Sequence, residues 1–308
     1  RARLPGQLQR SLPCSCRRRR WQHRPALQVT NEPILEFKPG SPERAALQKA
    51  LADLKGKTEE IPCVIGGEEV WTPTVRYQLS PFNHAHKVAK FCYASKELIN
   101  KAINAALAAR KEWDLKPVQD RAQIFLKAAD MLSGPRRAEV LAKTMIGQGR
   151  GTGQSRERLG EGSQPSGSAG LGPGCGSPAP LRGELSPAER RSAPQGNAVL
   201  WKPSDTALLS SYAVYQVLLE AGLPPNVVQF VPADGPEFGD AVTGSEHFCG
   251  LNFTGSVPTF KRLWKQVSEN LDRYRNFPRL AGGTSPSCRF LGCRVPIPCG
   301  LREQQISG

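Results

Sequence analysis

Two short stretches in the second half of the chain place charged or small residues directly after an apolar run. Lys202 and Asp205 lie on either side of Pro203, at a corner just after the run 198–201, where a cation and an acid could form hydrogen bonds with the hydroxyl groups of a sugar. Gly255 and Ser256 stand just before a helical pattern, where backbone N–H groups and the positive helix end favour a phosphate. The alternatives are a solvated turn lysine at position 202 and an ordinary helix N-cap at position 256.

The pattern around these stretches predicts a sheet that would bring both to one edge. Short apolar runs at 198–201, 226–231 and 249–253 predict strands, and helical patterns alternate with them. The residues expected on the apolar helix faces are Leu208, Tyr212, Tyr215 and Leu219 in the first helix, and Val257, Phe260, Trp264, Val267 and Leu271 in the last. Such alternation is typical of βαβ units on a parallel sheet, which binds ligands at the carboxyl ends of its strands. The sequence contains no G-x-G-x-x-G motif of the common dinucleotide-binding type.

The first half of the chain shows further helical and strand patterns. Ser41 and Ser95 are predicted to cap two helices, and Gly66-Gly67 is predicted to form the turn of a hairpin. The expected elements are helices at 41–55, from 95 to Pro117, at 121–132 and at 136–145, a hairpin within 63–79 and a strand at 87–94.

Several runs of residues resemble the aldehyde dehydrogenase family. They are Trp201-Lys202-Pro203-Ser204-Asp205, Phe253-Thr254-Gly255-Ser256, Val231-Pro232-Ala233-Asp234-Gly235-Pro236, Gly255-Ser256-Val257-Pro258-Thr259-Phe260 and 108–117. The last three are similar to the mitochondrial branch of that family that oxidises L-glutamate gamma-semialdehyde. The resemblance covers about two thirds of the chain, at 25–150 and 196–282. It implies an α/β fold, namely an incomplete Rossmann-like NAD-binding domain of the aldehyde dehydrogenase type with a parallel sheet, without the family's catalytic domain.

The resemblance also implies that the cofactor is NAD. The family's lysine and acid at the first corner hold the adenosine ribose, and its glycine and serine before the last helix approach the pyrophosphate. Carried over to this chain, the cofactor-binding residues are Lys202, Ser204, Asp205, Phe253, Thr254, Gly255, Ser256, Val257, Pro258 and Thr259. No metal site is expected, because the cysteines near the end of the sequence form no C-x-x-C pair.

The predicted domain organisation has five parts. These are a basic segment similar to a mitochondrial transit peptide at 1–24, the first part of the NAD-binding domain at 25–150, an insert at 151–195, the βαβ core at 196–283 and an unstructured tail at 284–308. The insert contains ten Gly, six Pro and seven Ser, a composition that predicts disorder. The family has helices and a strand in this place, so the resemblance implies that they are missing here.

No catalytic residue is assigned in this sequence. The family's general base would follow Gly282, where this chain has Gly283 and Thr284. Ser80-Pro81-Phe82-Asn83 imitates the family's oxyanion motif but lies far upstream of the expected place, so Asn83 is predicted to be a turn residue. Cys288 lacks the surroundings of the family's nucleophile, and Cys249 is predicted to be inert on a buried strand. We therefore expect this chain itself to be inactive.

Three functions are compatible with these observations. The resemblance implies NAD-dependent oxidation of L-glutamate gamma-semialdehyde (delta-1-pyrroline-5-carboxylate) to L-glutamate in proline degradation. The alternative is a non-enzymatic NAD-binding fragment or decoy subunit. The third is nucleic-acid binding, suggested by the net charge of +15. Residues 1–31 carry eight Arg and no acid, so much of the basicity belongs to the beginning of the chain, which argues against a nucleic-acid groove.

Partners and location follow from the same observations. The resemblance implies a small-molecule substrate and the mitochondrial matrix. The placement of the basic residues argues against a nucleic-acid partner. No membrane partner is expected, because no apolar stretch approaches the ~18 residues that a membrane helix needs. Members of the family form homo-oligomers, but the family's oligomerisation strands are not recognised in this sequence.

Overall fold

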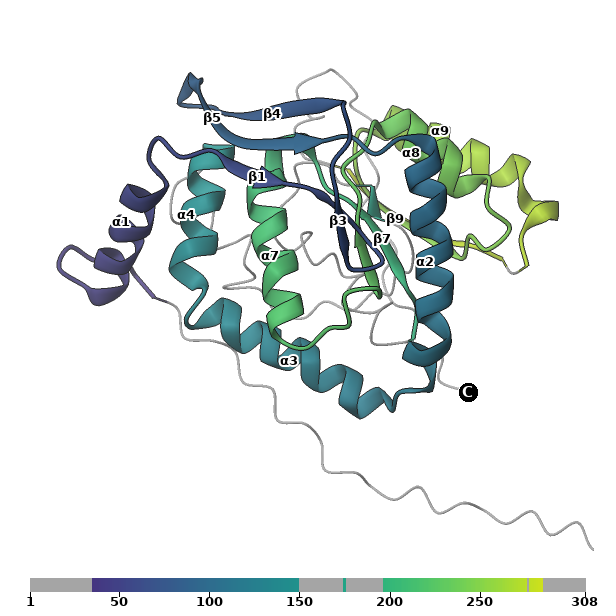
Figure 1. The fold of residues 1–308 in the computed structure, drawn as a ribbon, viewed down its shortest axis with the longest axis horizontal. Coiled ribbons are helices and arrows are strands. Elements are labelled where there is room, and N and C mark those ends of the chain that lie inside the picture. The colour runs from purple at the N-terminus through teal and green to yellow at the C-terminus, as the bar shows by residue number, and fades with distance from the viewer. Residues whose placement is uncertain (1–34, 150–173, 176–195, 276, 285–308) are drawn as a thin grey trace, which may run out of the picture. The chain divides into compact units, whose positions relative to one another are not determined.

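The structure, a computed structural model, describes residues 35–149, 174–175, 196–275 and 277–284 (Figure 1). The segment 1–24, the insert apart from 174–175 and the tail after Thr284 lie outside these residues. The α-helices are α1 (Pro42–Leu54), α2 (Lys96–Leu115), α3 (Val118–Ser133), α4 (Arg137–Gln148), α7 (Leu208–Glu220), α8 (Gly235–Thr243) and α9 (Val257–Glu269), with 3-10 turns at Asp205–Ala207 and Leu271–Arg273. The strands are β1 (Glu59–Ile61), β2 (Cys63–Ile65), β3 (Glu68–Val70), β4 (Val75–Ser80), β5 (Asn83–Cys92), β6 (Gly174–Cys175), β7 (Val199–Lys202), β8 (Val228–Phe230), β9 (Gly250–Gly255) and β10 (Arg279–Thr284).

The larger sheet has the strand order β10-β9-β6-β7-β8-β2-β3. Neighbouring strands from β10 to β8 run parallel, which confirms the predicted parallel βαβ sheet, whereas β2 is antiparallel to both of its neighbours. The chain leaves β7 through α7 to reach β8, and then crosses through α8 to β9 on the other side of β7. The direction in which strands are added therefore reverses between β7 and β9.

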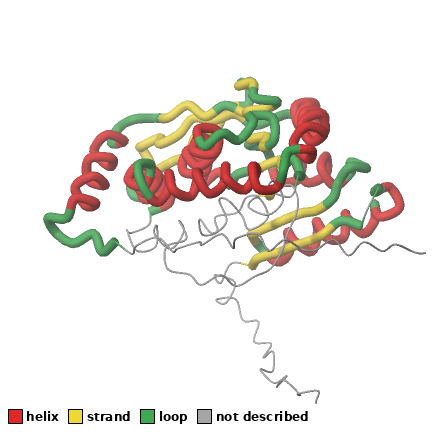
Figure 2. Tube along the Cα trace, turned by 90° about the horizontal axis from the view of Figure 1, so that it is seen from below, coloured by secondary structure: helices red, strands yellow, loops and turns green. Residues whose placement is uncertain are grey.

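The helices cover both faces of this sheet. Val199 and Trp201 of β7 pack with residues of α3, α4 and α7, whereas Leu200 packs with residues of α2, α8 and α9. The rings of Trp201 and Phe230 meet edge to face, with centroids 5.5 Å apart. In Figure 2 the helices, in red, flank the strands, in yellow. A strand that is buried along its whole length is typical of a parallel sheet covered on both sides.

Most of the elements predicted for the first half of the chain are present, but β1 is not predicted, and the hairpin expected within 63–79 is confined to β2 and β3 because β4 pairs with β5. Ser41 and Ser95 cap α1 and α2 by accepting hydrogen bonds from backbone N–H groups three residues further on, both at 3.4 Å. Gly66 and Gly67 join β2 to β3 with φ values of 64° and 87°, in the left-handed region that favours glycine. β1, β5 and β4 form a second sheet in that order, seen across the top of Figure 1.

Three details of the second half differ from the prediction. The insert is expected to contain no strand, yet 174–175 form β6, because the gap between β7 and β9 offers backbone partners on both sides. Residues 279–284 form β10 by parallel pairing with β9, so Thr284 lies in a strand and not in the predicted unstructured tail. Trp264 is predicted on the buried face of α9 but is 55% exposed, and the helix buries Leu263 and Val267 instead. The buried face of α9 is therefore centred on Leu263, the residue before Trp264.

The buried amide of Gln78, in β4, joins the smaller sheet to the helices behind the Asp205 corner. Its Nε2 donates to the carbonyl oxygens of Gly147 (3.1 Å) and Thr206 (2.7 Å), and its Oε1 accepts from the backbone N–H of Leu209 (2.9 Å). A Cβ atom at position 147 would lie 2.7 Å from Nε2, so glycine there makes room for the amide. The N–H of Leu209 belongs to the first turn of α7, where a helix lacks internal partners.

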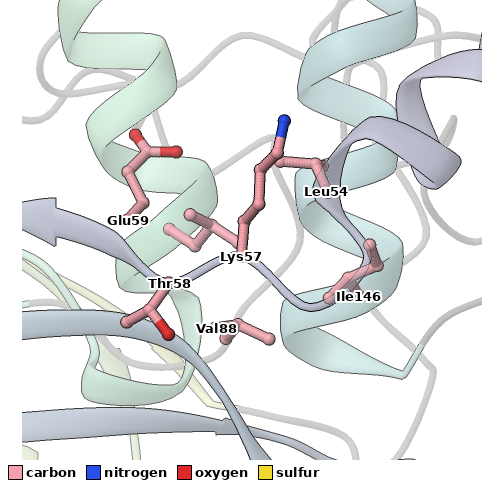
Figure 3. Close-up of a pocket in the computed structure, with 7 residues that line it drawn as sticks. Leu54, Lys57, Thr58, Glu59, Val88 and Ile146 are labelled. Atoms are coloured by element: carbon pink, nitrogen blue, oxygen red, sulfur yellow. The ribbon is translucent and has the colours of Figure 1, made fainter.

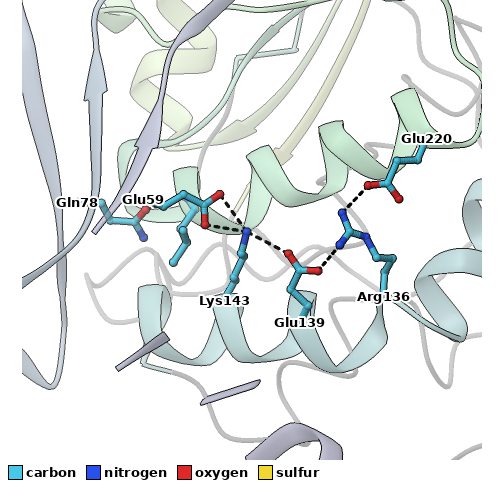
Figure 4. Close-up of polar contacts among 7 residues, drawn as sticks. Glu59, Gln78, Arg136, Glu139, Lys143 and Glu220 are labelled. Carbon is cyan, nitrogen blue, oxygen red and sulfur yellow. Dashed lines mark hydrogen bonds and ion pairs between the residues drawn. The ribbon is translucent and has the colours of Figure 1, made fainter. Parts of the chain in front are cut away.

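A network of charged side chains links α4 to β1 and to the end of α7 (Figure 4). Lys143 Nζ lies 2.7 Å from Glu59 Oε2 in β1 and 3.2 Å from Glu139 Oε1. Arg136 contacts Glu139 and Glu220, each at 2.5 Å, which adds the end of α7 to the network. The side chain of Lys143 is only 6% exposed, so removing its carboxylate partners would leave a buried charge unpaired.

Replacing Gln78 is expected to destabilise the fold. Gln78→Met keeps the side chain's approximate volume but removes three hydrogen bonds and leaves the Leu209 N–H buried without a partner. The free energy of unfolding, measured by urea denaturation, should fall by about 1–3 kcal/mol. The matched control Gln48→Met, on the exposed side of α1, should change it by about 0.5 kcal/mol or less. Equal effects of the two substitutions would contradict the role given to Gln78.

Candidate functional site

The first candidate stretch forms the corner between β7 and α7. Lys202 is the last residue of β7, and Asp205 begins the 3-10 turn that leads into α7. Lys202 is 7% exposed, so its interpretation as a solvated turn lysine is wrong. Its Nζ lies 3.4 Å from the carbonyl oxygen of Pro203. An ammonium group has three donors, so this long hydrogen bond leaves it able to bind a further acceptor.

The carboxylate of Asp205 has two different environments. The hydroxyl of Tyr93, the residue after β5, donates a hydrogen bond to Oδ2. Oδ1 is buried and has no hydrogen-bond partner among the residues that the structure describes. Burial, followed by the hydrogen bond and the charge of Asp205, raises the pKa of Tyr93, so its hydroxyl stays protonated as a donor. The corner therefore presents one carboxylate oxygen that is held and one that is unsatisfied.

Sequence reasoning did not find Tyr93. The residue lies 112 positions before Asp205, and the order of the strands brings the two side chains together. The available signal was weak: an aromatic residue with a polar tip directly after a predicted strand. Tyrosine at such a place is common for reasons of packing alone.

The second candidate stretch forms the start of α9. β9 ends at Gly255, and Ser256 caps the helix by accepting from the N–H of Thr259 at 3.3 Å, so its interpretation as an N-cap is confirmed. The rings of Phe253 and Phe260 stack with centroids 5.8 Å apart and hold α9 against β9. The backbone N–H groups and the positive end of α9 therefore face the edge of the sheet where β9 ends.

The two stretches lie at the same edge of the sheet. Through β6, Lys202 pairs with Cys175, and Cys175 pairs with Phe253. Two strand spacings separate Lys202 from Phe253, a backbone distance of about 10 Å. The other predicted site residues are Ser204 before the 3-10 turn, Thr254 in β9, and Val257 and Pro258 with Thr259 in the first turn of α9. This edge is also where the strand order reverses, the usual place for a ligand in an open α/β sheet.

None of the ten predicted site residues lines either of two cavities near the smaller sheet. One of about 180 Å³ lies between Thr58 and Val88 on one side and Leu54 and Ile146 on the other (Figure 3), and no predicted site residue lines it. The other is an open cleft of about 670 Å³ whose lining includes Tyr93. The cleft therefore reaches the side chain that holds Asp205, whereas the cavity in Figure 3 is a separate feature.

The residues that could be mistaken for catalytic groups have other environments. Asn83 lies at the β4–β5 turn, and its Oδ1 accepts from the N–H of Ala85 at 3.1 Å, consistent with the predicted turn role. Cys63 and Cys92 are buried with their Sγ atoms 3.8 Å apart. The hydrogen bond with Cys92, together with burial, raises the pKa of the Cys63 thiol. Cys249 is exposed and lies just before β9, so the prediction that it is buried in the strand is wrong.

None of the helices in the described residues has both the length and the apolar character needed to cross a membrane. In the same residues, His, Cys, Asp and Glu side chains form no group of three or more that could hold a metal ion.

Comparison with known proteins gives one family. The model described as "Aldehyde dehydrogenase family" matches residues 72–163 and 192–286, and the break between them lies within the predicted insert. The chain is 62% identical over 291 residues to the mitochondrial delta-1-pyrroline-5-carboxylate dehydrogenase of Mus musculus and 61% identical to that of Homo sapiens. Each alignment covers 85% of this chain and 52% of the relative. The chain thus spans about half the length of these curated relatives.

A solved structure has a similar fold. It is the delta-pyrroline-5-carboxylate dehydrogenase from Mycobacterium tuberculosis bound with NAD. The TM-score is 0.74 at 32% sequence identity, and the match covers 83% of this chain and 54% of that one.

The cysteine environments predict the pattern of alkylation in the folded chain. Cys63 and Cys92 should resist iodoacetamide because both are buried, and the raised pKa of Cys63 further reduces its thiolate. Cys249 should react faster than these two because it is exposed, although burial of its thiol raises its pKa and slows the reaction. Peptide mass spectrometry would read each site, and the same reaction in urea, where all three should be modified, is the control. Rapid labelling of Cys63 or Cys92 without urea would contradict the buried pair.

Proposed function

The chain belongs to the aldehyde dehydrogenase family, and we propose that it binds NAD where β7 and β9 end. Asp205 carries the proposal, because its Oδ1 is buried without a partner among the described residues. A ribose hydroxyl could satisfy this oxygen, whose isolation is otherwise costly. The reversal of strand order beside it and the similar fold of a relative bound with NAD support the same proposal.

Each corner has a proposed part in holding the cofactor. Lys202 and Asp205 hold the adenosine ribose, through an ammonium donor and a carboxylate acceptor. Gly255 and Ser256 lie against the pyrophosphate at the N-terminus of α9, where backbone N–H groups favour negative charge. The flanking residues in this proposal are Ser204, Phe253, Thr254, Val257, Pro258 and Thr259. When bound, NAD supplies the hydride acceptor for oxidation of a substrate.

The proposed reaction is NAD-dependent oxidation of L-glutamate gamma-semialdehyde to L-glutamate in proline degradation. The names and the identity of the mouse and human relatives support it. The same names, together with the basic composition of residues 1–24, support a mitochondrial location, and we propose the matrix. In this proposal the partner is a small-molecule substrate.

The polypeptide of residues 1–308 is proposed to bind NAD without oxidising the aldehyde. This route needs a thiolate nucleophile, donors for an oxyanion and a base for the deacylating water. Asn83 is engaged in a turn, and Cys63 and Cys92 are buried against each other. In this proposal these residues therefore do not act as the nucleophile or as the oxyanion donor.

Removing the ammonium at the first corner is expected to weaken NAD binding. Lys202→Ala should raise the Kd for NAD about tenfold or more, because a hydrogen bond from a charged group is lost. Isothermal titration calorimetry would measure it. Lys265→Ala, whose side chain is 78% exposed on α9, is the matched control and should leave the Kd unchanged. Unchanged binding by Lys202→Ala would refute this placement of the ribose.

Disturbing the helix start is expected to weaken NAD binding through the pyrophosphate. Ser256→Pro removes one N–H and the capping hydroxyl, so the Kd should rise about tenfold. Ser268→Ala, near the other end of α9, is the control because it removes a serine hydroxyl away from the proposed site. A Kd that does not respond to Ser256→Pro would place the pyrophosphate elsewhere.

Purified residues 1–308 are expected to form no NADH from glutamate semialdehyde and excess NAD. Loss of a single oxyanion donor can already lower a rate about 10²–10³-fold, and here the nucleophile and base are also unassigned. NADH absorbance measures the reaction against a no-protein blank. Turnover that is abolished by one Cys→Ala substitution would contradict the proposal and identify the nucleophile.

A further inference from the structure

We propose that Tyr93 is a positioning residue that aims the carboxylate of Asp205 at the 2′-hydroxyl of the adenosine ribose and so helps the site to select NAD over NADP. The inference rests on the proposed function, because it assigns a partner to a residue of that same site. Its basis is the juxtaposition of a held oxygen, Oδ2, and a buried, unsatisfied oxygen, Oδ1, on one carboxylate.

The position of Tyr93 is itself fixed by the strands around it. Its N–H donates to the carbonyl oxygen of Thr74 (2.9 Å), and its carbonyl oxygen accepts from the hydroxyl of Thr72 (2.6 Å). The ring lies 5.8 Å from that of Phe91, and the guanidinium carbon of Arg76 lies 5.5 Å from its centroid. A tyrosine has few rotatable bonds, so these contacts hold the hydroxyl in place before any ligand arrives.

Fixing one oxygen determines where the other points. A carboxylate on a short side chain can rotate, and rotation would move Oδ1 away from the ribose and leave both oxygens without the Tyr93 donor. With Oδ2 held, Oδ1 can accept one hydroxyl, as acidic residues accept the ribose 2′-hydroxyl in dinucleotide sites. A 2′-phosphate offers no such donor and brings like charge against Asp205. The phenol therefore contributes to selectivity without touching the nucleotide.

The charges facing Tyr93 support a neutral donor. The positive charge of Arg76, which lies over the ring, lowers the pKa of the hydroxyl. The negative charges of Asp205 and Asp234 raise it. Burial is the largest influence on the group, and it favours the protonated phenol. The raised pKa of Tyr93 therefore keeps its hydroxyl protonated, and able to donate to Asp205, at neutral pH.

The test combines a residue change with a ligand change. Calorimetry on the full chain would compare NAD with its analogue that lacks the adenosine 2′-hydroxyl, for the unmodified protein and for Tyr93→Phe. The unmodified protein should bind the analogue about tenfold more weakly than it binds NAD. Tyr93→Phe should bind NAD about tenfold more weakly than the unmodified protein does, and its Kd values for NAD and the analogue should differ by less than about threefold. Tyr77→Phe, on the exposed side of β4, is the matched control and should discriminate as the unmodified protein does.

A second variant keeps the test decisive if Tyr93→Phe unfolds. Asp205→Asn removes the charge but keeps the shape, and it should reduce the preference for NAD over NADP by about tenfold. In that background Tyr93→Phe should add little, since the two groups act as one unit. The folded state of each variant is checked by its thermal unfolding.

The outcomes separate this inference from the proposed function. If the unmodified chain does not bind NAD, both are wrong. If it binds NAD but Tyr93→Phe weakens NAD and the analogue by the same factor, Tyr93 has only a structural role, and the NAD site stands without this inference. Only loss of discrimination in Tyr93→Phe, with discrimination kept in Tyr77→Phe, supports it.

Discussion

The amide of Gln78 makes three hydrogen bonds to two backbone segments that are far apart in the sequence, at Gly147 and at 206–209, and the corner at Asp205 depends on them. Two of these bonds go to Thr206 and Leu209, on either side of the junction between the 3-10 turn and α7. Since the first turn of a helix cannot satisfy its own N–H groups, a partner from elsewhere must do so. Here that partner comes from β4, so the smaller sheet helps to hold the end of β7 in place.

The same sheet also supplies a wall of the proposed nucleotide site. Tyr93 follows β5, which pairs with β4 along most of its length, and its hydroxyl reaches Asp205. The β4–β5 hairpin thus contacts the corner at two places. The amide of Gln78 bonds to its backbone, and the hydroxyl of Tyr93 bonds to the carboxylate of Asp205. The network of ion pairs from Glu59 through Lys143 to Glu220 also connects β1 of this sheet to α4 and α7. A movement of the hairpin would therefore change both the support and the lining of the corner.

Much of the fold could be predicted because its signals are local. Serine caps, the Gly66-Gly67 turn and the helical spacing of apolar residues each act within a few positions, and the structure has the corresponding elements. The misses have a common origin. β6 and β10 depend on the backbone partners that β7 and β9 offer, and the orientation of α9 depends on the surface beneath it, so Trp264 is exposed although its spacing suits the buried face.

By itself, the sequence determined the two corners, because Lys202, Asp205 and Ser256 each lie where an apolar run meets a helical pattern, and that junction is local. It also determined the family, through short runs of neighbouring residues. Only the tertiary structure decided that Lys202 is buried, that Tyr93 holds one oxygen of Asp205 and that the other oxygen has no partner among the described residues. The contact between Tyr93 and Asp205 joins residues 112 positions apart. The order of strands in the sheet, which brings such residues together, is set by the packing of the whole chain rather than by spacing along it.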